Sequence, residues 1–422
     1  MTNTDHAARW AWLRQHTPAL AGRVYLNAGF QGPISEPVAA AMHEWLDREV
    51  KEGPTSRPVL DARRAMATRY RELMAHAFGA DPDEMAITDN TTHGMNMVTA
   101  GLSVEAGDGV VTSGVEHASG LVPVYALRER RGADLHIVPV TAEDSPGTML
   151  EAFGRALDAR TRLVLISGVS YSTGQRLPEA EIAALAHQQN PNAFVLIDGA
   201  QTAGHEPLDM HASGVDAHAF PMHKWLCGPG GLGALYIRRD RIADIEPAAM
   251  SFHGAKRFDF AGGFEPERNS IEKFELTTVS GVLLAGGIAA VEQYIESGPQ
   301  AVWDRVRELN VAAERRIGGI PGVTVTSPTS DATRSGLFAF RVEGIPPSEV
   351  SAQLWLAGKV VCRAVAETNC VRLTLHVYNN ESDIDVVAGV IEDAIKNGVS
   401  EAARELAAIP FGQPAPTSLT PS

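Results

Sequence analysis

Two neighbouring stretches, FVLIDGAQ (194–201) and FPMHKWLCGPGGLG (220–233), decide the fold. In each, a short apolar run ends in polar side chains: Asp198 in the first, and His223 with Lys224 in the second. Continuous apolar runs are typical of strands buried on both faces of a parallel sheet. Such sheets bind ligands beyond the carboxyl ends of their strands, so we expect these side chains at a site.

Similar runs recur on both sides, and helical patterns separate them. Strands are expected in EMAIT, DGVVTS, DLHIVPV, TRLVLISGV, DAHAFP and GALYIRR, and helices in SGLVPVYALRERR and PEAEIAALAHQQN. This alternation predicts an α/β fold with a mostly parallel central sheet. From about residue 300 the order changes to that of a smaller α+β domain. We expect an N-terminal segment packing with the small domain (1–24), a large domain (25–295), the small domain (296–409) and a disordered tail (410–422).

Bulk properties exclude several classes of partner. The formal net charge of −15 argues against nucleic acid and anionic membranes. Three cysteines, an odd and sparse number, favour a reducing compartment over a disulfide-stabilised secreted fold. No 18-residue apolar run and no signal-peptide pattern is present. We therefore expect a cytoplasmic protein outside the membrane.

Three local signals suggest chemistry, and two of them also have a plainer interpretation. Asp198 at a strand end is also a common turn cap. Lys224 lies in an apolar, glycine-flanked stretch, where burial lowers the pKa of an amine and makes it nucleophilic toward an aldehyde. Thr91 and Thr92 in ITDNTTHGMN lie where a strand passes into a helix; hydroxyls and free N–H groups there suit a phosphate, or simply cap the helix.

Taken together and in order, the segments TTHGMN, EHAS, SYSTG, DGAQ, HKW–GPGGLG and VRLTLHVYNN resemble the successive motifs of the class V aminotransferase family. Its members are pyridoxal-phosphate (PLP) enzymes of fold type I. The resemblance runs from Tyr25 to about residue 390. It is closest to the cysteine desulfurase and isopenicillin N epimerase-like branch, which includes carbon–sulfur lyases. It implies PLP as the cofactor and an amino acid as the substrate.

The resemblance assigns the ring-binding side chains. It implies that Lys224 holds PLP as a Schiff base and later transfers the substrate proton. Asp198 matches the carboxylate that pairs with the pyridine nitrogen and keeps the ring electron-poor. Gln201 is similar to the residue that hydrogen-bonds the phenolic oxygen. His117 resembles the imidazole stacked on the ring, although alone it would be read as a histidine at a helix entry.

The resemblance also assigns a phosphate site. Thr91, Thr92 and His223 resemble its phosphate-binding residues. Thr278 matches a position from which a neighbouring subunit reaches that phosphate, which implies a homodimer. The family often has a hydroxyl two residues before the HK pair, where this chain has Pro221 three residues and Met222 two residues before Lys224. One phosphate contact is therefore expected to be lost or replaced.

Arginines and cysteines separate the branches of the family. Arg372 resembles the arginine that grips the substrate α-carboxylate, a task that suits a planar bidentate donor. Arg363 is a weaker candidate for the same pocket, and a surface role is the alternative. Desulfurases carry a persulfide cysteine on a mobile loop, which is cut short here. Cys362 and Cys370 are expected to be packed thiols, which disfavours a persulfide-forming desulfurase.

The leading hypothesis is a PLP-dependent lyase that cleaves the C–S bond of a cysteine S-conjugate by Cα deprotonation and β-elimination. A decarboxylating or oxidative variant in specialised metabolism stays open. An aminotransferase and an epimerase are alternatives, and the epimerase would need a second acid/base such as Tyr171 or His93. A non-catalytic cofactor-binding protein is disfavoured by the intact set of site residues. No metal is expected, because the histidines at 205, 211, 218 and 223 lack regular ligand spacing.

Overall fold

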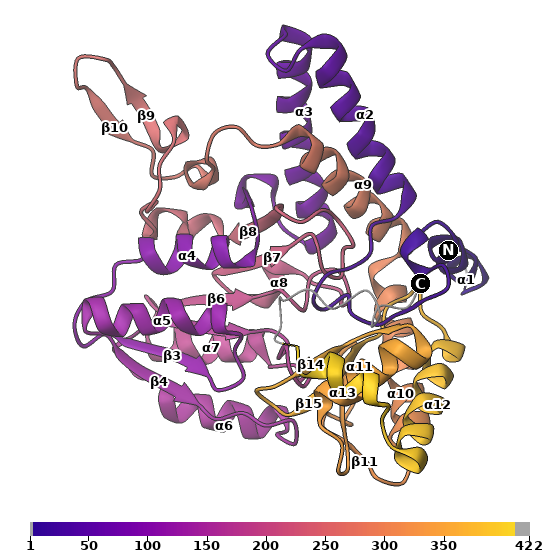
Figure 1. Ribbon diagram of the computed structural model, residues 1–422. Coiled ribbons are helices and arrows are strands. Elements are labelled where there is room, and N and C mark those ends of the chain that lie inside the picture. The colour runs from indigo at the N-terminus through magenta and orange to yellow at the C-terminus, as the bar shows by residue number, and fades with distance from the viewer. Residues whose placement is uncertain (1–2, 410–422) are drawn as a thin grey trace.

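The computed structural model describes residues 3–409 and contains two packed parts (Figure 1). The first is a seven-stranded sheet flanked by helices, in the order β2-β8-β7-β6-β5-β3-β4. Strand β8 runs antiparallel to both of its neighbours, and the other adjacent pairs are parallel. The predicted α/β fold with a mostly parallel sheet is confirmed.

Every strand expected in this region is present. The strands are β2 (Met85–Thr88), β3 (Gly109–Ser113), β4 (Asp134–Val138), β5 (Thr161–Ser167), β6 (Phe194–Asp198), β7 (Ala217–Pro221) and β8 (Gly233–Ile237). The helices are α1 (Asn3–Gln15), α2 (Glu36–Glu52), α3 (Arg57–Phe78), α4 (Thr91–Gly101), α5 (Ala118–Arg131), α6 (Pro146–Ala156), α7 (Glu179–Gln189), α8 (Met210–Ser213) and α9 (Gly281–Ser297). Short 3-10 helices are η1 (Pro18–Leu20), η2 (Pro82–Glu84), η3 (Arg239–Asp244), η4 (Phe252–Gly254) and η5 (Ile271–Phe274).

The continuous apolar runs are explained by two cores, one on each face of the sheet. In β5, Val164 and Ile166 pack into one core, whereas Leu163 and Leu165 pack into the other. Successive side chains of a strand point to opposite faces, so a strand covered on both sides needs apolar residues at every position. The polar residue that ends such a strand therefore lies at the sheet edge.

The second part is built on an antiparallel sheet in the order β11-β12-β15-β14. Its strands are β11 (Val323–Val325), β12 (Leu337–Val342), β14 (Arg363–Val365) and β15 (Cys370–Thr374), and its helices are α10 (Pro299–Ile317), α11 (Pro347–Gly358), α12 (Glu381–Asn397) and α13 (Glu401–Ala407). The early strand β1 (Val24–Tyr25) pairs with β13 (Val360–Val361), and Arg14 in α1 forms an ion pair with Asp383 at 2.7 Å. The domain limits proposed above stay a prediction, and the expected disordered tail lies outside the described residues.

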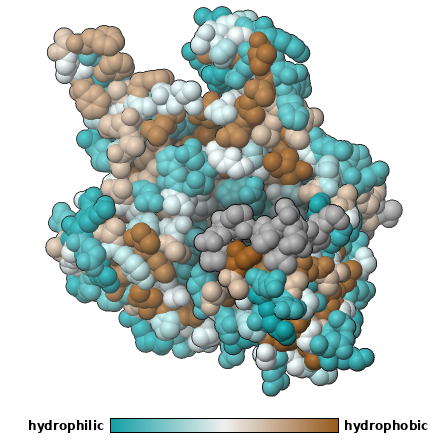
Figure 2. Space-filling model, viewed as in Figure 1, coloured by the Kyte–Doolittle hydropathy of each residue, from teal (hydrophilic) through white to brown (hydrophobic). Residues whose placement is uncertain are grey.

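A hairpin that the sequence patterns do not predict projects from the large part (upper left in Figure 1). It consists of β9 (Ala255–Phe258) and β10 (Phe264–Pro266). Phe258, Phe260 and Phe264 are exposed on it, and Figure 2 shows its surface in tan and brown. Within residues 3–409, no helix is both long and apolar enough to cross a membrane.

Candidate active site

Adjacent strand ends build the site. Asp198 is the last residue of β6, and its register partners are Ser167 at the end of β5 and Ala219 in β7. Lys224 follows the end of β7 by three residues. These ends open into a pocket of about 530 Å³. Its lining includes every predicted site residue except Thr278, namely Thr91, Thr92, His117, Asp198, Gln201, His223, Lys224, Arg363 and Arg372.

Lys224 and Asp198 influence each other across this pocket. Burial raises the pKa of Asp198, and the positive charge of Lys224 opposes that shift. Burial lowers the pKa of Lys224 to about 8, against the attraction of Asp198. One oxygen of Asp198 accepts a hydrogen bond from the Ala200 amide at 3.0 Å, which fixes the carboxylate. The lysine thus has more free amine near neutral pH than an exposed lysine would.

Gln201 is held on both ends of its amide. Its Nε2 donates to the Gly29 carbonyl at 2.8 Å, and its Oε1 accepts from the Trp225 indole at 2.9 Å. A Cβ at Gly29 would lie 2.8 Å from Thr374 Oγ1 and 3.1 Å from Gln201 Oε1, so only glycine fits there. The second Nε2 hydrogen remains for a ligand. The HKW motif therefore locks Gln201, a role of Trp225 that sequence reasoning missed.

His117 begins α5 and caps it, since its Nδ1 accepts from the Ser119 amide at 3.2 Å. Burial and then Lys224 lower its pKa, which keeps the imidazole neutral. The preceding Glu116 is buried and accepts short hydrogen bonds, each 2.5 Å, from Ser113 and Ser167. Burial raises the pKa of Glu116 to about 7. Sequence reasoning missed this cluster, which ties the ends of β3 and β5 beneath the His117 turn, although Glu116 stands in the EHAS motif.

One end of the pocket fits an anion. Thr91 is the first residue of α4, where helix N–H groups lack intrahelical partners. Thr91 Oγ1 and His223 Nδ1 are buried and have no hydrogen-bond partner among the described residues. Burial lowers the pKa of His223 to about 4, so its imidazole is neutral at neutral pH. Thr92 is exposed at the same helix start. Unpaired buried polar atoms are costly, and a phosphate group would satisfy them.

Two arginines face the pocket from the second sheet. Arg363 in β14 lies opposite Arg372 in β15. Burial and then the positive charge of Arg363 lower the pKa of Arg372 to about 10, because both disfavour the charged guanidinium. Arg372 donates to the Tyr171 carbonyl at 2.5 Å and to Asn27 Oδ1 at 3.5 Å, whereas its Nε has no partner among the described residues. A carboxylate would offset the repulsion between the two arginines and accept a hydrogen bond from Arg372 Nε.

Some expected or tempting residues lie elsewhere. Thr278 is exposed, in a loop with φ of 68°, and does not reach the pocket of its own chain. Tyr171 lines the pocket, and its ring meets His117 edge-on at 4.9 Å between centroids. His93 does not line it, because its Nδ1 turns back to accept from the Asp89 amide. Pro221 lines the pocket, and the neighbouring Met222 is buried in the core.

The three cysteines all lie outside this pocket. Cys370 is buried in β15, and burial raises its thiol pKa. Cys362 is half-buried and contacts Ser351 Oγ at 3.5 Å, and burial raises its pKa to about 11. For Cys227, burial raises the pKa to about 12. All three are protonated thiols at neutral pH, which is a poor state for a nucleophile.

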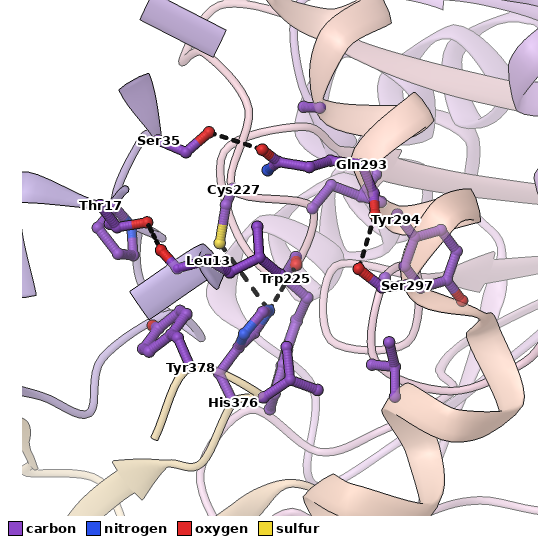
Figure 3. A pocket seen from close by; sticks show the side chains of 16 residues that line it. Leu13, Thr17, Ser35, Trp225, Cys227, Gln293, Tyr294, Ser297, His376 and Tyr378 are labelled. Carbon is purple, nitrogen blue, oxygen red and sulfur yellow. Dashed lines mark hydrogen bonds between the residues drawn. The ribbon is translucent and has the colours of Figure 1, made fainter. Parts of the chain in front are cut away.

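The turn after Lys224 closes a second, small cavity of about 40 Å³ (Figure 3). His376 lies there, four residues beyond Arg372, and its Nε2 donates to the Trp225 carbonyl at 3.0 Å. Its ring also stacks on Tyr378 at 4.4 Å. The segment that follows the strand of Arg372 thereby supports the turn that follows Lys224. Both parts of the molecule therefore hold the pocket in place.

Comparison with known proteins shows the family of the chain. The family model for aminotransferase class V matches residues 33–387. The chain is 28% identical over 400 residues to a probable cysteine desulfurase of Methanothermobacter thermautotrophicus (90% of this chain, 97% of that protein). It is 30% identical over 351 residues to probable cysteine desulfurase 2 of Mycobacterium leprae (76% of this chain, 80% of that protein).

Solved structures point the same way. The cystine C–S lyase C-DES, in complex with its product cysteine persulfide, superposes with a TM-score of 0.84 at 29% identity, over 89% of this chain and 99% of that one. A C-DES mutant with glycine covalently linked to its PLP cofactor gives a TM-score of 0.84 at 28% identity, over 90% of this chain and 99% of that one. Family model and fold agree, and the chain belongs to the class V aminotransferase family, as a PLP-dependent enzyme of fold type I.

Proposed function

We propose that this enzyme cleaves the C–S bond of a cysteine S-conjugate by Cα deprotonation and β-elimination. One observation carries the proposal: a single pocket gathers Lys224, Asp198 and Arg372, and no cysteine lines it. The C–S lyase and cysteine desulfurase names of its relatives support cleavage at sulfur. A persulfide-forming desulfurase needs a reactive thiolate, and the raised pKa values of the half-buried Cys362 and the buried Cys370 argue against one.

Lys224 would hold the cofactor aldehyde and, once the substrate amine takes its place, remove the Cα proton. When bound, PLP supplies an electron-poor ring that accepts negative charge from Cα. Asp198 would face the ring nitrogen and keep it protonated, and that positive charge in turn keeps the buried carboxylate ionised. Gln201 would donate its remaining N–H to the phenolic oxygen, and neutral His117 would lie against the ring. Thr91, Thr92 and His223 would bind the phosphate.

Arg372, helped by Arg363, would bind the substrate α-carboxylate and so orient the bonds at Cα. After Lys224 takes the proton, the C–S bond breaks and its electron pair leaves with sulfur as a thiolate. The remaining three-carbon unit hydrolyses to pyruvate and ammonia, which balances the atoms without an oxidant or reductant. A decarboxylating or oxidative variant would add carbon dioxide release or start from an oxidised sulfur.

An epimerase is the second candidate. It requires a second acid/base on the ring face opposite Lys224. Tyr171 supports this candidate because it lines the pocket next to His117. Burial raises the pKa of Tyr171, however, which suits a proton donor better than a base. Transamination needs only the residues assigned above and stays a further alternative.

We propose a homodimer as the working form. Thr278 is exposed on a loop outside its own pocket, as a residue that serves a neighbouring site would be. The hairpin of β9 and β10 exposes Phe258, Phe260 and Phe264, and apolar surface of this kind favours burial against another chain. Sedimentation of a Phe260→Ser variant tests this. A shift from twice the chain mass toward the chain mass supports the proposal, and a wild-type protein that sediments as a monomer contradicts it.

Product analysis tests the function. The purified holoenzyme is incubated with S-methylcysteine or cystine in heavy water, with Lys224→Ala as the control. The proposal expects pyruvate in step with the sulfur product: methanethiol from S-methylcysteine, and cysteine persulfide from cystine. Exchange of the α-proton with neither product favours the epimerase. A keto acid with the sulfur retained favours transamination. Release of sulfur with alanine in place of pyruvate contradicts elimination. The same products from a Cys362→Ala variant show that this reaction does not depend on the Cys362 thiol.

A further inference from the structure

A groove larger than the catalytic pocket lies beside it. Its volume is about 860 Å³, and it runs between α11, β14 and the end of α13. Apolar side chains such as Trp355 and Ala352 share its walls with Ser348, Ser351 and Glu367. Such a mixed lining, mostly apolar with a few polar groups, is typical of a small-molecule site.

Two bridges connect the groove to the catalytic pocket. Phe30 and Arg363 line both hollows, and the Arg363 guanidinium lies 5.1 Å from the centroid of the Phe30 ring. Tyr171 lines the catalytic pocket and Glu367 lines the groove, and burial and then the charge of Glu367 raise the pKa of Tyr171. The boundary that the two hollows share is therefore formed by an aromatic ring and a planar cation, with Tyr171 on the pocket side and Glu367 on the groove side.

The position of Arg363 sets the direction in which a substrate would extend. Arg363 lies opposite Arg372 across two hydrogen-bonded strands. An amino acid whose carboxylate is bound at Arg372 thus lies next to the boundary that the pocket shares with the groove. A small β-substituent would stay within the catalytic pocket, whereas a long one has the groove beside it.

We propose that this groove binds the distal part of the substrate, an extended S-substituent that ends in an aromatic ring. The inference rests on the proposed C–S lyase function and names its substrate class. Trp355 and Phe30 offer ring surfaces, and the guanidinium plane of Arg363 stacks well on aromatic groups. Ser348 and Glu367 provide polar contacts at the rim, where Ser348 is exposed.

A matched pair of substrates tests the groove: S-methylcysteine and S-(3-phenylpropyl)cysteine both release an alkyl thiolate, so their intrinsic reactivities are alike. The longer substrate is expected to have a kcat/KM at least about tenfold higher. Ser348→Trp, which adds bulk at an exposed wall position, should reduce that ratio toward one, as should Trp355→Ala. Lys396→Trp, on the exposed face of α12 and outside the groove, is the matched control and should leave the ratio unchanged.

A binding measurement makes the test independent of turnover. The thioether acid 3-(3-phenylpropylthio)propanoate has no amine and cannot react at the cofactor. Calorimetry should show tighter binding of this acid to the wild-type holoenzyme than to Ser348→Trp, again by about tenfold. Equal binding by both, or equal kcat/KM for the two substrates, overturns the groove assignment. Absence of pyruvate from both substrates instead overturns the lyase function.

A shortened chain that ends at Ile409 tests the alternative that residues 410–422, and not a substrate, occupy the groove. The described residues end in this groove, with Leu406 and Ile409 among its lining residues, so the test includes a chain without residues 410–422. A substrate preference that persists in this shortened chain supports a substrate site. A preference that disappears shows that residues 410–422 form the binding surface, and it overturns the proposal.

Discussion

Two regions of the molecule hold a lysine whose pKa falls to about 8, and of these two lysines only Lys224 lines the candidate pocket. Lys224 stands half-buried at the wall of a 530 Å³ pocket that also contains Asp198. Lys273, in η5, is buried, and its ammonium donates to the carbonyls of Ile242 and Arg268, each at 2.7 Å. Burial is the main cause of the lowered pKa in both.

The difference shows what turns a desolvated amine into a reagent. At Lys273 two backbone carbonyls accept hydrogen bonds from the ammonium, which lines neither the catalytic pocket nor the groove, so it holds the segments of Ile242 and Arg268 together. At Lys224 no side-chain hydrogen bond is recorded among the described residues, and the amine faces space, a carboxylate and two arginines. A shifted pKa indicates a functional site only when the group also faces a cavity and lacks hydrogen-bond partners within the protein.

The largest effect is expected for Lys224→Ala. Loss of the amine removes both the cofactor tether and the proton acceptor, so kcat/KM for S-methylcysteine should fall by about 10³-fold or more. The visible absorbance band of the bound cofactor should disappear, while circular dichroism stays that of a folded protein. A variant that keeps both the band and the activity contradicts the assignment.

A smaller loss is expected for Asp198→Asn. The amide keeps the shape of the side chain but no longer holds the ring nitrogen positive, so kcat should fall by about 10²- to 10³-fold. The Ala200 hydrogen bond can persist, and stability should change little. Steady-state kinetics and urea unfolding measured on the same preparation separate the two effects. A loss of stability with unchanged kcat would make Asp198 a structural residue only.

Lys273→Met should do the opposite: it should lower stability and leave activity nearly unchanged. Methionine fills a similar volume but leaves the carbonyls of Ile242 and Arg268 without a donor, which costs about 1–3 kcal/mol of unfolding free energy. Activity should stay within about twofold of wild type. Urea unfolding with Lys396→Met as the exposed control measures the cost, and a large loss of kcat would break the distinction between the two lysines.

The smallest expected effect is a shift in the pH at which the rate of PLP binding rises. Only the free amine of Lys224 attacks the aldehyde, so the rate of PLP binding to cofactor-free enzyme should rise with pH through about 8 and then level off. Asp198 raises the pKa of Lys224, and Asp198→Asn should therefore move the inflection to lower pH. Stopped-flow absorbance records it, and a shift to higher pH contradicts the coupling.

Sequence patterns were sufficient for the large-sheet side of the pocket. Lys224, Asp198 and Gln201 directly follow or end buried strands, and parallel strand ends meet at one edge, so local order alone brings them together. The role of Lys273 was not predictable in this way. It stands between glutamates in the segment IEKFE, which favours an exposed helix, and only tertiary packing buries it.

The side formed by the second sheet was less predictable. Arg372 follows from a motif, but Arg363 lies on a three-residue strand whose pairing decides where it points. The groove near Trp355 joins segments from residue 27 to residue 409, and no local pattern encodes such a junction. The same holds for the hairpin around Phe260, where exposed aromatics have no helical or strand period to reveal them.

Covalent mapping of the cofactor tests the central claim most directly. The holoenzyme is reduced with borohydride, which fixes the carbon–nitrogen bond between PLP and its lysine, and its peptides are then analysed by mass spectrometry. The account predicts one reduced adduct, on Lys224, with Lys273 unmodified in the same digest. An adduct on Lys273 or any other lysine, or none at all in a protein that shows the visible cofactor band, would contradict it.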